Sequence, residues 1–417
     1  MIRRYRYRVE AGPAAEQALN RIFGGCRHVH NAYIAAAREA YASGSPHPSE
    51  SEASKLLITQ GRANPDTAWL KELPTIALRG ALRDAAQAYE NFFASHAGTR
   101  KGAKMGHPRF KRRHARQAAR FYEAGFSIRG GWQNTQRGGG RLYLAKVGLV
   151  SVNWDRPLPS SPSSVTVIKE ADGTWWASFV VTVPVSEPAP PAHPDRAAGI
   201  DLGLKDLVTV AYSDGTREKV AAPKYYRTAE RKLGRAQKKL ARARRGSKNR
   251  EKLRTHVARI HSRTANLRRD FARQLVARLI RENQTIALET LNITGMVRSR
   301  YAKSIHDAGW GLLVRELETH AALHGRTVVR ADRFFASTRT CAICETKSGP
   351  TTPDVREWTC TCGATLDRDY NAATNLMVRA LAPGKAERLN ACGRDIRLRL
   401  AGAVSDEAGT HRNEVAA

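Results

Sequence analysis

The chain has 417 residues, which is long enough for two or three domains that each bury a core. Its 70 Lys and Arg residues against 38 Asp and Glu residues give a formal net charge of +32 at pH 7, which favours nucleic acid or an anionic membrane as partner. A membrane is the weaker alternative, because no apolar run approaches the ~20 residues of a spanning helix and the charged start lacks the apolar core of a secretory signal. Clustered cysteines indicate a reducing compartment. We therefore expect a cytoplasmic protein that binds nucleic acid.

The N-terminal part predicts a strand followed by helices. Residues 3–9 alternate as a short strand, and the apolar side chains of residues 12–125 recur mostly at helical spacing, as at Ile22, Cys26 and Val29. Within this part, residues 100–116 read RKGAKMGHPRFKRRHAR. A solvated charged loop is one interpretation, but basic residues interleaved with an aromatic one favour contact with a phosphate backbone.

From residue 126 the apolar period changes to two. Four runs are predicted strands: 142–144, 149–152, 165–168 and 175–183. Together with the N-terminal strand they predict a small β-barrel that the helical segment interrupts. The Pro-rich run VPVSEPAPPAHP that follows is typical of a semi-extended linker between domains.

The second half begins with a buried-type strand, 197–202, which carries Asp201, and continues with a strand over 207–212. Residues 224–270 hold eighteen Lys or Arg against three acids and predict a pair of basic helices broken at Gly246. A solvated helix pair is the alternative, but this excess of positive charge would repel itself without a polyanion, so nucleic-acid contact is favoured.

A later strand, 285–288, ends at the acid Glu289, and a helix over 310–324 and a strand over 327–331 lead into a cysteine-rich segment. A final helix begins with Asp369. Acids on a central strand, at the end of a later strand and on a late helix can meet at one sheet edge. Three carboxylates there would bind Mg²⁺, and two ions ~3.5–4 Å apart act on the attacking water and the leaving oxygen of a phosphodiester. Each acid alone is more often a turn residue or a cap.

Four cysteines fall in two close pairs, Cys341/Cys344 and Cys360/Cys362. Thiolates at this spacing bind Zn²⁺ tetrahedrally, and four of them close the site to water, so one structural zinc ion is predicted. Buried, reduced cysteines are the alternative. The second pair departs from the commoner Cys-x-x-Cys spacing, because it reads Cys-Thr-Cys.

Several motifs together resemble TnpB, the family of RNA-guided nucleases encoded by small insertion sequences and related to compact type V CRISPR effectors. The resemblance extends from residue 1 to about residue 380 and is looser over 42–73. The matching segments are RYRYRVE with FGGCRHVHNAY, GHPRFK, GIDLGLKDLVTVA, ALETLNITGM, KSIHDAGWG, and FFASTRTCAICE through WTCTCGATLDRDYNAATNL.

The resemblance implies an α+β multidomain fold. It implies a β-barrel wedge domain with a helical recognition insertion, then an RNase H-like (RuvC) nuclease domain with a zinc-binding insertion. We expect these parts at 1–10 with 126–183 (wedge), 11–125 (recognition), 184–196 (linker), 197–340 with 364–380 (nuclease, including the basic helices 224–281), 341–363 (zinc knuckle) and 381–417 (a disordered tail without apolar periodicity).

The family motifs place the catalytic, magnesium-binding acids at Asp201, Glu289 and Asp369, with a supporting role for Asp367. We expect Asp367 to lie at or before the N-terminus of the last helix. One departure is Glu345, where the family's first zinc knuckle usually has Gly.

The expected function is that of an RNA-guided DNA endonuclease with two Mg²⁺ ions and one Zn²⁺ ion. A guide RNA would pair with the target strand of double-stranded DNA, and the protein would read a short flanking motif. Two alternatives remain open: a guided DNA-binding repressor that does not cleave, which would not need three acids, and a DNA transposase, which would also use three carboxylates.

Overall fold

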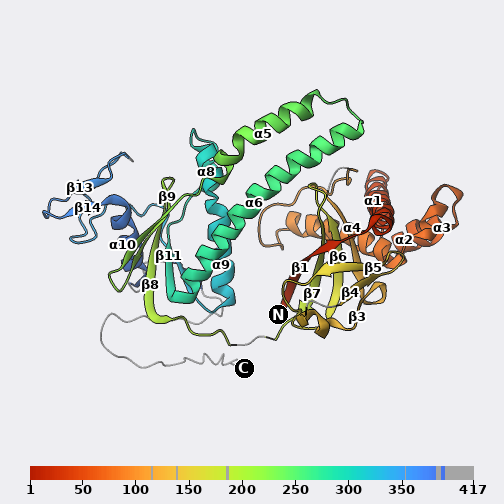
Figure 1. The fold of residues 1–417 in the computed structure, drawn as a ribbon, viewed down its shortest axis with the longest axis horizontal. Coiled ribbons are helices and arrows are strands. Elements are labelled where there is room, and N and C mark those ends of the chain that lie inside the picture. Colours follow the sequence, from red (N-terminus) through yellow and green to blue (C-terminus); the bar gives the residue numbers. More distant parts are fainter. Residues whose placement is uncertain (114–115, 138–139, 185–186, 353, 382–386, 390–417) are drawn as a thin grey trace. The chain divides into compact units, whose positions relative to one another are not determined.

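The computed structural model describes the whole chain except residues 114–115, 138–139, 185–186, 353, 382–386 and 390–417. The chain forms two compact units, Met1–Ser186 (unit 1) and Glu187–Ala417 (unit 2), which we describe separately (Figure 1). The boundary between them falls inside the Pro-rich segment predicted as a linker. No helix in the described part of the chain combines the length and the apolar character needed to cross a membrane.

Unit 1 combines a curved antiparallel sheet with a helical segment. The sheet is nearly closed, like a barrel, and has the order β2-β6-β7-β1-β5-β4-β3. Its strands are β1 (Ile2–Glu10), β2 (Gln117–Tyr122), β3 (Phe126–Arg129), β4 (Arg141–Leu144), β5 (Gly148–Asn153), β6 (Pro162–Lys169) and β7 (Trp175–Thr182). The helices between β1 and β2 are α1 (Pro13–Ala42), α2 (Glu50–Ser54), η1 (Lys55–Gln60), α3 (Gly61–Ala63), η2 (Pro65–Glu72) and α4 (Thr75–His96), and η3 (Glu123–Gly125) and η4 (Trp132–Arg137) flank β3.

Strand β2 lies in the region that the sequence predicts as helical, so the second part of the barrel begins at Gln117 and not at residue 126. Its buried side chains, Ala119 and Phe121, recur at period two, and the strand itself pairs with β6. The alternation covers only two apolar residues and follows the basic run, so the pattern is too short to oppose the helical periodicity before it.

The helical segment and the barrel share one hydrophobic core. Ile22 and Val29 of α1 and Leu78 of α4 are buried in the same cluster as Tyr7 of β1 and Phe179 of β7. The helical spacing seen in the sequence therefore marks the face that packs on this common core, and the two predicted domains form one compact unit.

Unit 2 contains a six-stranded mixed sheet in the order β10-β9-β8-β11-β12-β15. Strands β8, β11 and β12 are parallel, and the remaining pairs are antiparallel. Its strands are β8 (His193–Leu202), β9 (Asp206–Tyr212), β10 (Arg217–Ala221), β11 (Asn283–Leu288), β12 (Thr327–Arg330) and β15 (Glu387–Leu389), with a separate hairpin of β13 (Glu357–Thr359) and β14 (Thr365–Asp367). Its helices are α5 (Tyr225–Arg242), α6 (Lys248–Glu282), α7 (Ile293–Met296), α8 (Ala302–Ala308), α9 (Trp310–Leu323) and α10 (Arg368–Leu381).

Two boundaries in unit 2 differ from the sequence predictions. Strand β8 already begins at His193, inside the segment predicted as linker. Strand β15 lies inside the predicted tail and pairs with β12. Residues 382–386 and 390–417 lie outside the described residues, so for them the predicted disorder stays a prediction.

The two faces of this sheet are covered by different helices. Ile200 of β8 and Leu288 of β11 belong to the core cluster formed with α6 and α9, whereas Ala287 packs in the cluster that includes Leu376 of α10. Because side chains alternate along a strand, Gly199 and Asp201 point to the face opposite Ile200, which is the α10 face.

Helix α10 approaches β8 so closely that Gly199 has no room for a side chain. A Cβ atom there would lie 2.5 Å from the backbone nitrogen of Met377 and would also collide with the carbonyl oxygen of Ala373. The backbone of α10 therefore lies directly against the backbone of β8, two residues before Asp201 on the same face of the strand.

Replacing Gly199 by Ala should lower the melting temperature of the protein and separate α10 from the sheet, because the added methyl group meets fixed backbone atoms. Overpacking of this kind costs about 1–3 kcal/mol. Gly234→Ala is the matched control: it lies inside helix α5 with nothing near its Cβ position. That control should raise stability by roughly 0.5–1 kcal/mol. Equal melting temperatures for Gly199→Ala and the unaltered protein would contradict the close approach.

Candidate active site

Asp201 and Glu289 lie at the carboxyl ends of neighbouring parallel strands. Ile200 of β8 is in register with Leu288 of β11, so the next residue of each strand is one of the two acids. The backbone N–H of Leu202 donates to Oε1 of Glu289 over 3.2 Å. The structure thus brings together two acids that are 88 positions apart in the numbering, at one edge of the sheet.

Both carboxyls are held in a poor environment for negative charge. Burial, followed by repulsion from Glu289 and Asp369, raises the pKa of Asp201 well above its ordinary value. Burial also raises the pKa of Glu289 to about 7, although the Leu202 N–H works in the other direction. A carboxyl pair with raised pKa values is typical of a site that a cation or substrate completes.

Asp369 lies in the first turn of α10 and adds its charge to this edge. Nη1 of Arg356 contacts both of its carboxylate oxygens, at 3.2 Å and 3.1 Å, and Nζ of Lys219 lies 4.0 Å from Oδ2. The side chain of Asp369 is 19 % exposed, so it remains within reach of solvent and ions.

Asp367 caps helix α10. Its Oδ1 accepts the backbone N–H groups of Asp369 (3.0 Å) and Tyr370 (2.9 Å), and its Oδ2 receives a hydrogen bond from Lys219 over 2.6 Å. Partial burial would raise the pKa of Asp367, but Lys219 and the Tyr370 N–H hold that pKa below its usual value. The prediction that Asp367 lies at the helix N-terminus is confirmed, and its ionised carboxylate fixes the direction of the residue beside it.

The four cysteines form a cluster in which all Sγ atoms lie within 4.8 Å of one another. The Sγ atoms of Cys341 and Cys362 are 4.0 Å apart and those of Cys344 and Cys360 are 3.5 Å apart. A tetrahedral zinc site with Zn–S bonds of ~2.3 Å has sulfur atoms about 3.8 Å apart, so the donor set fits this ion.

One thiol of the cluster ionises more readily than an ordinary cysteine. The backbone N–H of Cys362, followed by the hydroxyls of Ser348 and Thr346, lowers the pKa of Cys360 to about 5. Since a thiolate is the form that binds metal, Cys360 is prepared as a ligand at neutral pH.

The two departures from the expected knuckle pattern, Glu345 and the Cys-Thr-Cys spacing, both lie in tight turns of the backbone. Glu345 takes a backbone φ of +59°, the left-handed conformation in which Gly is favoured. Cys-Thr-Cys forms the turn of the β13–β14 hairpin, which closes through the N–H of Cys360 to the carbonyl of Ala364 (2.8 Å) and has Gly363 at a φ of +87°. The hairpin supplies the tight turn that the shorter spacing requires.

Two buried asparagines of α10 connect the cysteine cluster to the candidate active site. Nδ2 of Asn371 and of Asn375 donates to the carbonyl of Thr340 over 2.7 Å and 2.6 Å, and Oδ1 of Asn371 accepts the N–H of Ala342 over 2.8 Å. Residues four apart share one face of a helix, so both amides bind the backbone beside Cys341. The helix that carries Asp369 is thereby fastened to the first cysteine knuckle.

Sequence reasoning missed four residues of this site: Lys219, Arg356, Asn371 and Asn375. The asparagines had a signal, because polar residues spaced by four in an otherwise apolar helix face indicate buried hydrogen bonds. Lys219 and Arg356 had none, since they are two of 70 basic residues in the chain.

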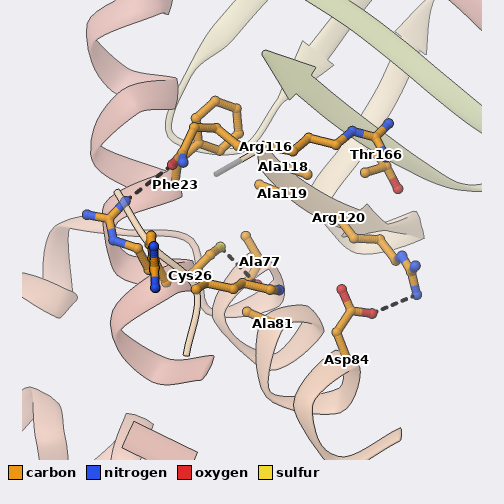
Figure 2. Close-up of a pocket in the computed structure, with 14 residues that line it drawn as sticks. Phe23, Cys26, Ala77, Ala81, Asp84, Arg116, Ala118, Ala119, Arg120 and Thr166 are labelled. Carbon is orange, nitrogen blue, oxygen red and sulfur yellow. Dashed lines mark hydrogen bonds and ion pairs between the residues drawn. The ribbon is translucent and has the colours of Figure 1, made fainter. Parts of the chain in front are cut away.

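Unit 1 places the GHPRFK motif against α1. Asn31 donates to the carbonyl of Lys111 over 3.0 Å and accepts its N–H over 2.8 Å, and Arg38 donates to the carbonyl of Pro108 over 3.2 Å. Beside the motif lies a cavity of about 60 Å³ (Figure 2). Its lining includes Lys111 and Arg116, and its one acid pairs with a further arginine, Asp84 with Arg120 at 3.3 Å. Contact of this basic segment with phosphate stays a prediction.

The three acids fit a divalent cation by the chemistry of their donors. Hard oxygen ligands are those that Mg²⁺ prefers, and two of the three carboxyls have raised pKa values that a bound cation would lower. In this structure the charge of Asp369 is balanced by Arg356 and Lys219.

Three family models match parts of this chain. Residues 178–300 match the OrfB_IS605 family model, described as "Probable transposase", residues 310–376 match the Cas12f1-like TNB domain, and residues 1–45 match a helix-turn-helix model of the OrfB_IS605 group. In the structure, residues 1–45 hold strand β1 and the single long helix α1.

Two curated relatives align over almost the entire chain. A protein of Streptomyces pristinaespiralis, described as a candidate RNA-guided DNA endonuclease, is 36% identical over 95% of this chain and 92% of its own length. InsQ of Escherichia coli K12, described in the same way, is 28% identical over 93% of each chain. The chain therefore belongs to the TnpB family, the OrfB proteins of IS605-type insertion sequences.

A solved structure shows the same fold. The cryo-EM structure of a Cas12f1–sgRNA–target DNA complex covers 89% of this chain and 84% of its own chain, with a TM-score of 0.54 and 12% sequence identity. The mixed helix and sheet architecture is thus shared with a protein of that type.

The raised pKa of Glu289 predicts a pH dependence of stability without added divalent cations. Its folded pKa of about 7 exceeds the ordinary value of 4.5, so the folded state binds more protons and loses stability as pH rises between these values. Glu289→Gln removes this loss. The variant should gain about 1–3 kcal/mol relative to the unaltered protein between pH 5 and pH 7.5 in denaturant titrations. A difference that does not change with pH would contradict the assignment.

The conformation of Glu345 predicts a stabilising substitution. Glu345→Gly should raise the stability of unit 2 by about 1 kcal/mol, because Gly adopts a positive φ without the steric cost paid by Glu. Glu357→Gly is the matched control: it is also an exposed glutamate but lies in strand β13, where Gly weakens the strand. Thermal melting of the zinc-loaded protein should rise for the first variant and fall for the second. A lower melting temperature for both variants would contradict the prediction, because the Glu345 side chain would then stabilise the protein by more than its backbone strain destabilises it.

Proposed function

We propose that this protein is an RNA-guided DNA endonuclease that acts in the prokaryotic cytoplasm. The observation that carries the proposal is the meeting of Asp201, Glu289 and Asp369 at one sheet edge of a chain that belongs to the TnpB family. The net charge of +32 supports binding of both a guide RNA and double-stranded target DNA. Sequence recognition would come from base pairing, with the protein reading a short flanking motif.

We further propose that unit 2 is an RNase H-like, RuvC-type nuclease domain. Three antiparallel strands, β10-β9-β8, continue into the parallel strands β11 and β12, and helices cover both faces. This arrangement supports the assignment, because the acids then stand at the carboxyl ends of β8 and β11 and at the start of α10. Unit 1 would contain the wedge and recognition elements.

Asp201, Glu289 and Asp369 would hold two Mg²⁺ ions. Bound Mg²⁺ supplies Lewis-acid stabilisation of the charge that builds up on the phosphate oxygens. The chain itself orients the acids: the Leu202 N–H holds Glu289, and Asp367 with Lys219 holds the first turn of α10. These contacts keep the carboxylates in place before substrate arrives.

The four cysteines would hold one structural Zn²⁺ ion. Four thiolates leave no open coordination position, so the ion would serve folding rather than chemistry. The amides of Asn371 and Asn375 would pass its effect to α10.

The two alternatives are a guided repressor without cleavage and a DNA transposase. All three acids are present and brought toward one edge, which a repressor does not need. The family model carries the description of a transposase, whereas the relatives that align over the full chain are described as RNA-guided endonucleases. The endonuclease is the better supported function.

Substitution of the acids tests the proposal. Asp201→Ala and Asp369→Asn should each lower Mg²⁺-dependent cleavage of guide-matched DNA at least ~10³-fold and leave guide and target binding within about twofold, since these side chains touch metal and not nucleic acid. Asp367→Asn is the matched control, because it should only lose about 0.5–2 kcal/mol of capping stability and keep partial activity. Gel shifts, cleavage rates and melting temperatures measure the three effects.

Two results would contradict this assignment. Cleavage by Asp201→Ala at the unaltered rate would remove the site altogether. An inactive Asp367→Asn beside an active Asp369→Asn would exchange the roles of the two residues.

The zinc proposal predicts about one zinc ion per chain by elemental analysis of the active protein. Cys341→Ser should lower both the zinc content and the cleavage rate, because structural zinc sites contribute on the order of 10 kcal/mol to folding. Cys26→Ser serves as control, since this thiol is buried in unit 1 and does not belong to the cluster. Active protein without zinc would rule the proposal out.

A further inference from the structure

A cavity of about 310 Å³ adjoins the candidate active site within unit 2. Two of its lining residues show the proximity. Leu204 follows Asp201 by three positions in the loop after β8, and Arg356 is the residue that contacts Asp369. The rest of the wall comes from the same loop after β8, from the segment before α5, from α5 itself and from α8.

The lining of this cavity is strongly cationic. It includes Lys205, Lys224, Arg227 and Arg356, with Asp307 as the one acid. Within the described part of the chain, neither the Lys205 nor the Lys224 ammonium forms an ion pair. Arg227 donates through Nη2 to the Ser304 hydroxyl over 2.7 Å, which holds its guanidinium at the wall.

The carboxylate of Asp307 is directed at the backbone that starts helix α5, and among the described residues it forms no ion pair with these cations. It is 4 % exposed, and its two oxygens accept the backbone N–H groups of Tyr226 (2.7 Å) and Arg227 (3.1 Å). Asp307 therefore balances the positive end of helix α5. Lys205, Lys224 and Arg227 remain available to an anion, whereas Arg356 is paired with Asp369.

Lys224 adds an independent observation. It is the residue before α5 and has φ +50° and ψ +42°, the left-handed conformation that Gly or Asn adopts at lower cost. A strained backbone beside a cavity is typical of a functional position. The chain keeps a cation where the backbone alone would favour a small residue.

We propose that this cavity is a phosphate subsite for the DNA strand that is cut, and that Lys224, Arg227 and Lys205 bind a backbone phosphate next to the scissile one. The inference rests on the proposed endonuclease function and deepens it. Guanidinium and ammonium groups without carboxylate partners are the donors that recognise phosphate. The subsite would position the strand across the acids, and its phosphate would compete with Asp369 for the Arg356 guanidinium.

The first test uses the guide-loaded protein with Lys224→Gln and Arg227→Gln combined. Single-turnover cleavage should slow by about tenfold or more, the effect of losing a charge-assisted phosphate contact. Guide RNA affinity and target affinity, measured separately by gel shift, should stay within about twofold. Lys146→Gln in the β4–β5 turn of unit 1 is the control and should leave all three quantities unchanged.

The second test separates charge from backbone strain. Lys224→Gly relieves the positive φ and should raise the melting temperature while it slows cleavage. Lys146 has a φ of +63° but lines no part of this cavity, so Lys146→Gly should raise the melting temperature and leave cleavage unchanged. If Lys224 had a purely structural role, a variant with a higher melting temperature would not also cleave more slowly.

Cleavage at the unaltered rate by Lys224→Gly and by the double variant would overturn the subsite. A cleavage loss that is matched by an equal loss of guide RNA affinity would also overturn it, because the cavity would then hold a phosphate of the RNA. The proposed function is contradicted by a different result, namely cleavage by Asp201→Ala at the unaltered rate. That result does not depend on the cavity variants, so the two failures can be told apart.

Discussion

The contact of two backbones, helix α10 on strand β8 at Gly199, is the constraint on which the rest of unit 2 depends. A helix normally stands about 10 Å from a sheet because side chains fill the space between them. Here the hydrogen of a glycine replaces a side chain, and Ala373 of α10 approaches the strand directly. The first turn of the helix is thereby lowered to the level of the strand ends. Asp369 then lies close enough to Asp201 to raise the pKa of its carboxyl.

The same proximity makes the site unfavourable in electrostatic terms. Burial and mutual repulsion oppose ionisation of Asp201 and Glu289, whereas Arg356 and Lys219 balance the more exposed Asp369. Ionisation of Asp201 and Glu289 therefore lowers the stability of the folded state. The fold tolerates the repulsion because the surrounding contacts are strong: the buried asparagines fasten α10 to the cysteine segment, and Asp367 caps it.

The sequence predicted the residues whose chemistry depends on type and local spacing. The acids at the ends of short apolar strands and the paired cysteines could be located, since strand alternation and knuckle spacing are local signals. Strand β2 could not, because only Ala119 and Phe121 mark its buried face. Lys219 and Arg356 acquire a role only through contacts with residues far along the chain. Strand β15 is defined by its pairing with β12, which no short-range pattern reveals.

Strand β1 has a consequence for the synthesis of the protein. It lies in the middle of the barrel sheet, between β7 and β5, although it precedes both of these partners in the chain and is synthesised before them. Its main partner, β7, ends at Thr182, so most of β1 stays without that partner while more than 160 further residues are made. An unpaired strand exposes backbone N–H and C=O groups that can pair with another chain, but four of the nine residues of β1 are arginines: Arg3, Arg4, Arg6 and Arg8. Their mutual repulsion keeps waiting strands of neighbouring nascent chains apart until the barrel can close.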